Sequence, residues 1–300
     1  MWMKEARWKE GKKSVLTIAR LTFLEVLRKR VFFVTASLTV IFILLYGVAL
    51  NFTAQEIVRM NAHQASGQMV QQIIGNQLLG AGLYFASFLI ALLALLSSVG
   101  TISAEIENGL LHAIISKPIK RSAIIWGKFT GYGLMLACYS LLLYLAILAL
   151  NWHYNPVIFS LTKISDLLLG AFLITLHPLV LLGVALLFST LLKTLTAGIF
   201  AIILYGLGMV GGFLEQIGMV INNSNLINIG VLTSLFMPSD ALFRKLVAVV
   251  SGNQSNPLAT LSMGPFGVGA EPSNAMLVYT CFYVFNTLGL ATYIFKKKDL

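Results

Sequence analysis

Few side chains in this 300-residue sequence could do chemistry, and they stand far apart. Gly127 and Lys128 are the Gly-Lys pair that ends a phosphate-binding loop, but neither the following Ser or Thr nor the upstream Gly is present. The sequence also has no G-x-S-x-G hydrolase turn and no H-E-x-x-H zinc helix. We therefore expect no enzyme activity, and if ATP drives this protein, another polypeptide supplies the ATPase.

His177 is the one ionisable residue in the middle of a long apolar run, and Pro178 follows it. Such a residue marks a substrate pathway, or it bonds a carbonyl that the proline leaves free. Gly208 and Gly212 allow close helix approach, which suits either a pathway or plain packing. His177, Gly208 and Gly212 are therefore candidate pathway residues. The ten methionines form no cluster with Cys or His, so we expect no metal site.

The strongest local pattern lies in residues 105–131, which read EIENGLLHAIISKPIKRSAIIWGKFTG. Two acids, Glu105 and Glu107, precede a break at Gly109, and a short apolar helix then runs to a stop at Pro118. A short helix at a membrane surface must bury its apolar face on a partner or in headgroups. We therefore take this stretch, called the coupling segment below, as a candidate docking site; the alternative is a loop held at the membrane by its basic residues.

The elements that must position these residues are membrane spans. The chain is 58% hydrophobic and 11% charged, with a mean hydropathy of +0.85, whereas soluble chains are about 45–50% apolar and about 25% charged. The net charge of +10 could suggest nucleic acid, but Lys and Arg occur in short blocks between long uncharged runs. That arrangement is typical of membrane flanks, so we expect a lipid bilayer and no nucleic acid as partner.

The charge-free intervals predict an all-α integral membrane protein with six transmembrane helices, since about 20 apolar residues cross the hydrocarbon core. Residues 1–30 form an arm, and residues 31–300 form the transmembrane domain. Glu215 and Asp166 are expected at the outer ends of helices, and a short helix is expected at 237–250. The expected spans are residues 31–50, 78–102, 129–150, 167–192, 194–214 and 275–295, with outer regions at 51–77 and 218–274.

The basic residues also predict sidedness. Nine lie before the first span, four in the coupling segment, Lys193 between the fourth and fifth spans, and three at the C-terminus, which is 17 of the 21. Because positive charge stays inside, both termini are expected in the cytoplasm, with Arg244 and Lys245 outside. Residues 14–30 combine an apolar side with a charged one, which predicts an amphipathic helix in the inner interface.

At the coupling segment the sequence resembles the membrane subunits of bacterial ABC transporters of the ABC-2 type, in the branch grouped with multi-copper-enzyme maturation permeases. The family pattern is approximately E-x-E-x-G-T-L-x-x-L-L-S-x-P-x-x-R followed by G-K. Leu110 replaces the usual Thr, and Ile114-Ile115 replaces a Leu pair. The matching residues are Glu105, Glu107, Gly109, Leu111, Ser116, Pro118, Arg121, Gly127 and Lys128.

The resemblance implies that the segment between spans two and three is a cytoplasmic coupling helix that docks on an ATPase subunit. It also implies a bacterial inner-membrane exporter built from two permease chains, as homodimer or heterodimer, and two ATPases that bind ATP and Mg²⁺, with no cofactor on this chain. The residues assigned to coupling are Glu105, Glu107, Gly109, Leu111, Pro118, Arg121 and Lys128. The alternative is an energy-independent membrane scaffold or assembly factor.

Overall fold

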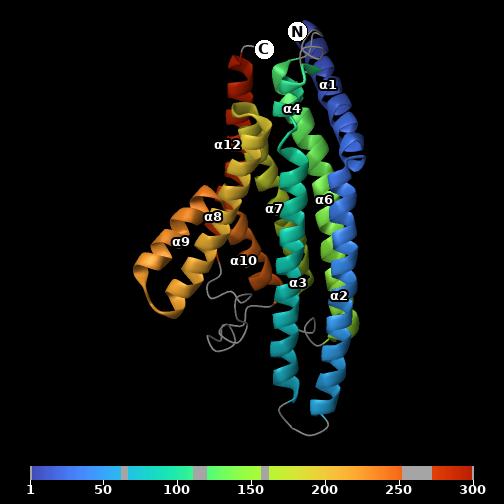
Figure 1. Ribbon diagram of the computed structural model, residues 1–300, viewed down its shortest axis with the longest axis vertical. Coiled ribbons are helices and arrows are strands. Elements are labelled where there is room, and N and C mark those ends of the chain that lie inside the picture. The colour runs from blue at the N-terminus through green and yellow to red at the C-terminus, as the bar shows by residue number, and fades with distance from the viewer. Residues whose placement is uncertain (1, 62–66, 111–119, 157–161, 252–271, 299–300) are drawn as a thin grey trace.

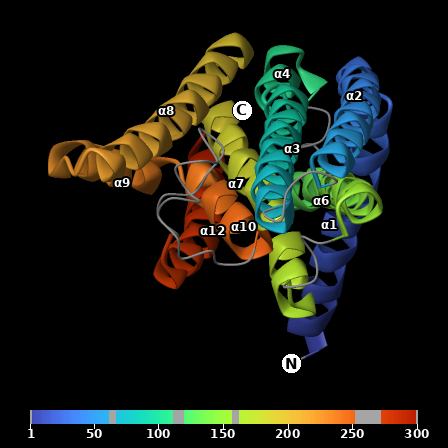
Figure 2. The same cartoon turned by 90° about the horizontal axis from the view of Figure 1, so that it is seen from below.

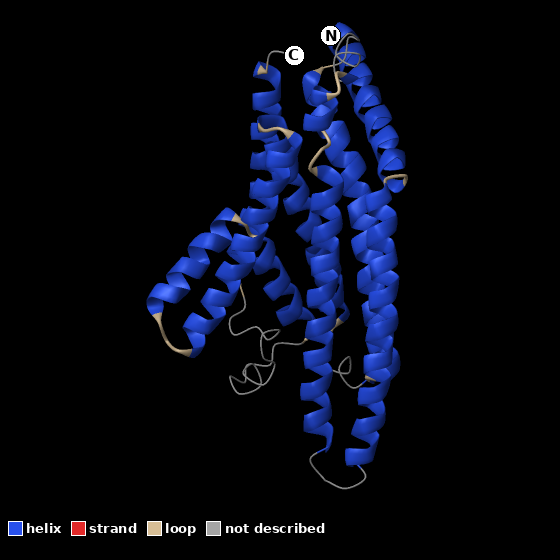
Figure 3. Cartoon of the chain, in the orientation of Figure 1, coloured by secondary structure: helices blue, strands red, loops and turns tan. Residues whose placement is uncertain are grey.

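Long apolar runs of the sequence form long helices in the computed structural model, which describes residues 2–61, 67–110, 120–156, 162–251 and 272–298. Within these ranges every regular element is a helix (Figure 3). Six helices are long and apolar enough to cross a membrane, which confirms the predicted all-α fold with six spans. They are α2 (Arg30–Asn61), α3 (Gly67–Ser98), α6 (Arg121–Tyr154), α7 (Ile164–Leu191), α8 (Thr194–Val220) and α12 (Asn274–Lys297).

Helix α7 is the centre of the bundle. In its most apolar 18-residue window 67% of the residues are buried within the protein, against 17% for α2. It packs against α3, α6, α8 and α12, as the view along the bundle shows (Figure 2). A helix that is apolar all round is buried in protein or lipid. Helix α7 also contains Pro178 in its interior and continues past it. Most residues in the second half of α7 therefore face other helices of this chain.

Helix α1 (Trp2–Leu27) packs along the first half of α6. Two glycines of α6 make this contact close. A Cβ on Gly127 would lie 2.7 Å from Ile18, and a Cβ on Gly131 would lie 2.6 Å from the carbonyl oxygen of Ala19. The start of α1 and the end of α12 lie at the same end of the bundle (Figure 1). We call this end the terminal end; the short α4 (Ser103–Glu107) lies there too.

Beyond α8 the chain turns back on itself. Asn222 has a φ of 54°, a left-handed conformation that Asn tolerates, and the side chain of Asn223 accepts a hydrogen bond from the N–H of Asn225 at the start of α9. Helix α9 (Ser224–Phe236) then packs along α8. Its uncharged sequence favours contact with α8 or lipid over water.

Helix α10 (Ser239–Val250) follows α9 after a bend of 105°. The bend lies level with the middle of the spans, because Met237 contacts Gly208 of α8 and Ser239 contacts His177, which is halfway along α7. We call α9 and α10 together the outer hairpin. The sequence predicted a helix at 237–250, which is present as α10. Helix α9 was not predicted, because the Asn, Gly and Ser residues around it are typical of loops.

Candidate functional site

The coupling segment begins at the terminal end of the bundle, where α4 follows α3. It is described through Leu110 and again from Lys120, whereas Leu111, Ser116 and Pro118 lie outside the described residues. Gly109 has a φ of 71° and open space around it. A side chain there would strain the backbone rather than collide with a neighbour.

Lys128 and Glu105 form an ion pair at this end. The Lys128 Nζ lies 2.5 Å from Glu105 Oε2 and also donates to the carbonyl oxygen of Thr101. Lys128 is only 5% exposed, and a buried ammonium is stable only when it is paired. The pair therefore fixes the first turns of α6 against α4.

Glu107 holds the start of α8. Its two carboxylate oxygens accept hydrogen bonds from the backbone N–H and the hydroxyl of Thr194, both at 3.0 Å. The hydroxyl oxygen of Thr194 also lies 2.9 Å from the hydroxyl oxygen of Ser103, within hydrogen-bond distance. A carboxylate at a helix N-terminus satisfies a free N–H and complements the helix dipole. Glu107 thus joins α4 to α8.

The end of α7 is held to the same turn. The backbone N–H groups of Ile102 and Ser103 both donate to the hydroxyl of Ser189, at 3.0 Å each. Ser189 is fully buried, so these bonds are shielded from water. The turn before α4 is therefore attached to α7 as well as to α8.

Arg121 contacts the end of α12. Its Nη1 donates to the carbonyl oxygens of Lys296 and Lys298, at 3.2 and 2.7 Å, and Lys298 Nζ donates to the carbonyl oxygen of Thr190 at 2.9 Å. Arg121, Glu105, Glu107 and Lys128 were all selected from the sequence as residues that serve a partner. In the structure each has a partner within this chain.

A second ionic group lies beside this cluster and was missed by sequence reasoning. Lys29, between α1 and α2, has its Nζ 2.5 Å from the Tyr132 hydroxyl and 3.2 Å from Glu25 Oε1. Burial alone would lower the pKa of Lys29, but the interactions with Tyr132 and Glu25 outweigh it and hold the pKa above its usual 10.5. Lys29 is therefore a charged link between α1 and α6. Its partner Tyr132 lies in an apolar run, where no local pattern marks it.

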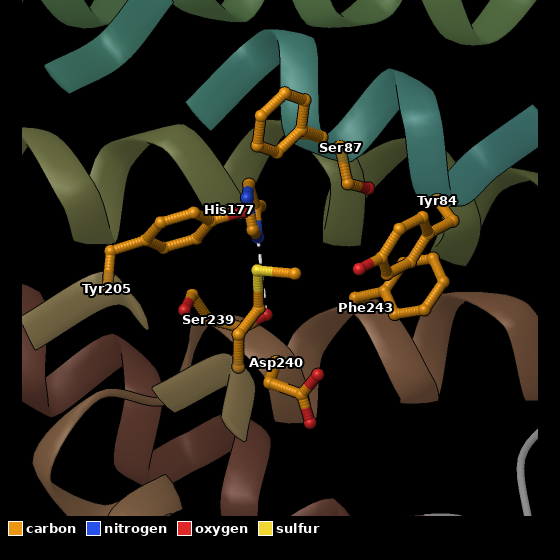
Figure 4. A pocket seen from close by; sticks show the side chains of 9 residues that line it. Tyr84, Ser87, His177, Tyr205, Ser239, Asp240 and Phe243 are labelled. Atoms are coloured by element: carbon orange, nitrogen blue, oxygen red, sulfur yellow. Dashed lines mark hydrogen bonds between the residues drawn. The ribbon is translucent and has the colours of Figure 1, made fainter. Parts of the chain in front are cut away.

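His177 lines a small pocket between α3, α7, α8 and α10, of about 290 Å³ including its open side. Its Nδ1 lies 3.2 Å from the carbonyl oxygen of Ser239. Figure 4 shows His177 facing Ser239, with Tyr205 to one side. The remaining lining residues are Tyr84, Ser87, Phe88, Met209, Asp240 and Phe243.

The other two candidate pathway residues are covered by the outer hairpin. A Cβ on Gly208 would lie 3.0 Å from Met237, and a Cβ on Gly212 would overlap the carboxylate of Asp240. Within this chain these glycines therefore serve close packing of α8 against the outer hairpin.

The outer hairpin also contains a buried ionic triad that the sequence did not reveal. Arg244 is 1% exposed, and it donates to Glu215 at 2.7 Å and to Asp240 at 2.9 Å. The sequence predicted Glu215 at the outer end of the fifth span and Arg244 outside the membrane, in the expected short helix at 237–250. In the structure Glu215 lies near the end of α8, and Arg244 of α10 is enclosed between the two helices and pairs with it.

Taken together, these groups hold neighbouring helices to one another. Among the residues that the structure describes, no three His, Cys, Asp or Glu side chains are placed to hold a metal ion. The charged residues instead join one helix to another, at the terminal end of the bundle and at the outer hairpin.

Comparison with known proteins identifies the family of this chain. A family model described as ABC-2 family transporter protein matches residues 16–300. A probable ABC transporter permease protein NosY from Pseudomonas aeruginosa is 39% identical over 93 residues, which cover 28% of this chain and 34% of that protein. The protein of the same name from Stutzerimonas stutzeri is 44% identical over 52 residues, covering 17% of this chain and 19% of that protein.

The matched stretches thus span about a third and about a fifth of the length of these two relatives. The family model, by contrast, covers nearly the whole sequence, including all six candidate spans. This chain therefore belongs to the ABC-2 family of transporter proteins.

Proposed function

We propose that this chain is the transmembrane permease subunit of an ATP-driven ABC exporter and that it pairs with a separate ATPase subunit, which binds ATP and Mg²⁺. Two features support this proposal. The family is one of transporter proteins, and the sequence has no phosphate-binding loop of its own. The energy for transport then enters through contact with another polypeptide.

The terminal end of the bundle is the cytoplasmic face in this proposal, and the membrane is the inner membrane of a bacterium. The described beginning of the coupling segment, the start of α1 and the end of α12 all lie at that end. Most basic residues of the sequence belong to these same parts, as the positive-inside rule requires. An ATPase in the cytoplasm meets this face.

One observation carries the proposal: the turn that begins the coupling segment is bonded to three different spans. Glu105 pairs with Lys128 of α6, the N–H of Ser103 bonds Ser189 of α7, and Glu107 bonds Thr194 of α8. Since a rigid contact transmits a displacement, a partner that moves this turn moves the ends of all three helices.

The complete transporter in this proposal contains two permease chains and two ATPases. The resemblance of the coupling segment to ABC-2 permeases supports this composition, and it leaves open whether the second permease chain is identical to the first. Transport then follows from closure of the ATPase pair, which pulls on both coupling segments together.

The proposal is tested by purifying a tagged copy of the chain from its native membrane in mild detergent. We expect an ATPase to co-purify in a one-to-one ratio, and ATP hydrolysis by that complex to fall when Glu105 is changed to Ala. Glu56→Ala is the matched control, because Glu56 is exposed and pairs only loosely with Arg59, at 3.5 Å. Recovery of the chain with no ATPase would instead support the scaffold alternative.

A further inference from the structure

We propose that α8 carries the movement of the coupling segment to the outer hairpin, with Glu107–Thr194 as its inner attachment and Glu215–Arg244 as its outer one. This inference rests on the proposed function, because it concerns how the energy of a partner ATPase reaches the far side of the membrane. It assigns positioning roles to four residues, three of which lie outside the coupling segment.

The inner attachment is specific to α8. Thr194 is the first residue of the helix, and both its N–H and its hydroxyl bond to Glu107. Gly100, in the turn before α4, lies close enough that a Cβ there would be 3.3 Å from the Thr194 methyl group. The first turn of α8 therefore cannot shift relative to α4 without breaking these contacts.

Helices α8 and α9 behave as one unit because their surfaces interlock. A Cβ on Gly211 would overlap the hydroxyl of Thr233, and a Cβ on Gly230 would lie 2.4 Å from Cβ of Glu215. The glycines thus let side chains of the facing helix lie directly against the backbone, and helices packed this closely do not slide freely past each other. A displacement of α8 therefore displaces α9 as well, and the pair stands away from the bundle (Figures 1 and 2).

The outer attachment joins this unit to α10. Arg244 on α10 bonds Glu215 on α8 at 2.7 Å and Asp240 on its own helix at 2.9 Å. Because Arg244 is enclosed, parting it from Glu215 would leave charge buried without its partner. Movement of α8 therefore draws α10 with it, and α10 in turn packs against α7 and α3.

The two attachments lie at opposite ends of the same helix, with residues 194 and 215 separated by nearly six turns. A partner that moves Glu107 thus acts on the outer hairpin through covalent helix and two polar contacts. This link could not be predicted from the sequence, because Glu107 and Arg244 are far apart along the chain and belong to different elements.

The test measures movement of the outer hairpin in the complete complex. Ser224, the exposed first residue of α9, is changed to Cys after Cys138 and Cys281 are replaced by Ser. The complex with its ATPase is reconstituted in vesicles, with ATP and vanadate supplied on the ATPase side of the membrane. A membrane-impermeant maleimide is added on the other side. We expect the nucleotide to change the labelling rate of the cysteine by about fivefold or more.

Two variants then test whether the movement reaches the outer hairpin through α8 rather than through other helices. Glu107→Ala removes the inner attachment. Glu215→Gln weakens the outer one while leaving Arg244 paired with Asp240, so the buried charge stays balanced. We expect Glu107→Ala to bring the nucleotide-dependent ratio of labelling rates close to one for the cysteine at Ser224. Because α9 moves with α8, the outer attachment is read at a second cysteine, placed at Ala248, a partly exposed residue of α10. There we expect either change to bring the ratio close to one, and the double variant to do no more than either alone. Glu56→Ala, on the exposed far end of α2, keeps the wild-type ratio.

Co-purification of the ATPase and ATP hydrolysis are measured for every variant, which distinguishes two kinds of failure. If no ATPase pairs with the wild-type chain, the proposed function fails and this inference fails with it. If the ATPase pairs and hydrolyses ATP, the inference alone is overturned by either of two results. One is labelling that nucleotide leaves unchanged in the otherwise wild-type protein, and the other is a full nucleotide response at Ala248→Cys in Glu107→Ala or Glu215→Gln.

Discussion

Glu105 and Lys128 lie at the two ends of the coupling segment, and their charged groups meet at 2.5 Å. The segment therefore closes on itself as a loop whose two ends are held together by a buried ion pair. Lys128 is one of the least exposed charged residues of the described chain. The pair therefore sets the distance between α4 and α6.

Removing one member of this pair should destabilise the protein as well as weaken coupling. Glu105→Ala leaves the ammonium of Lys128 buried with only a carbonyl oxygen as partner, and we expect a loss of about 3–5 kcal/mol in the free energy of unfolding. Thermal unfolding of the purified chain in detergent measures this loss. The double change of Glu105 and Lys128 to Leu and Met should restore most of it, because two apolar side chains leave no buried charge. If Glu105→Ala unfolds like the wild type, the pair has no structural role.

The contact between α1 and α6 depends on glycine. Gly131→Ala places a methyl group 2.6 Å from the carbonyl oxygen of Ala19, so we expect it to part the helices and cost about 1–3 kcal/mol of stability. Gly206→Ala is the matched control: it lies in the interior of α8, with nothing within 4 Å of the added Cβ. The control should be neutral or stabilising by about 0.5–1 kcal/mol, as alanine is the better helix former.

Limited trypsin digestion gives a second readout of the same contact. Cleavage at the exposed Arg20 of α1 and at the exposed Arg28 just after it should become faster in Gly131→Ala and stay unchanged in Gly206→Ala. Equal digestion rates in the two variants would show that α1 is held by other contacts.

The terminal end of the bundle should face the cytoplasm. Asn108 and Ser165 are exposed positions at opposite ends of the spans, on α4's C-terminal side and at the start of α7. With Cys138 and Cys281 replaced, we expect Ser165→Cys to react with a membrane-impermeant thiol reagent in intact cells and Asn108→Cys to react only after permeabilisation. The reverse pattern would place the coupling segment outside and exclude an ATPase partner at that end.

Six spans could be predicted from the sequence because each is bounded by charge, and the length of an uncharged run is a direct measure of its capacity to cross lipid. Glu215 shows where that reasoning ends. A charge was taken as the end of the fifth span, yet α8 continues to Val220, because Arg244 supplies a partner from 29 positions further on. No local pattern can show such a pairing.

The coupling residues illustrate a different limit. Their types and spacing identified the segment, but the spacing could not show that Glu107 is bonded to Thr194, since that contact depends on α7 and α8 returning beside α4. In the same way, His177 stood out in sequence as a lone ionisable residue, whereas its contact with Ser239 required the unexpected bend between α9 and α10.

The ionic triad should be the most sensitive feature of the outer hairpin. Arg244→Ala removes the only guanidinium between Glu215 and Asp240 among the described contacts and leaves two carboxylates enclosed together. We expect a loss of about 3–5 kcal/mol in stability, or loss of the folded protein from the membrane. Asp240→Asn should cost less, because Arg244 keeps Glu215 as its partner.

Arg59→Ala is the matched control, since Arg59 is 75% exposed and such surface changes alter the stability by no more than about 0.5 kcal/mol. The midpoint of thermal unfolding and the amount of protein recovered from membranes are compared across the three variants. Equal values for Arg244→Ala and Arg59→Ala would mean that the outer hairpin is held to α8 by glycine packing alone.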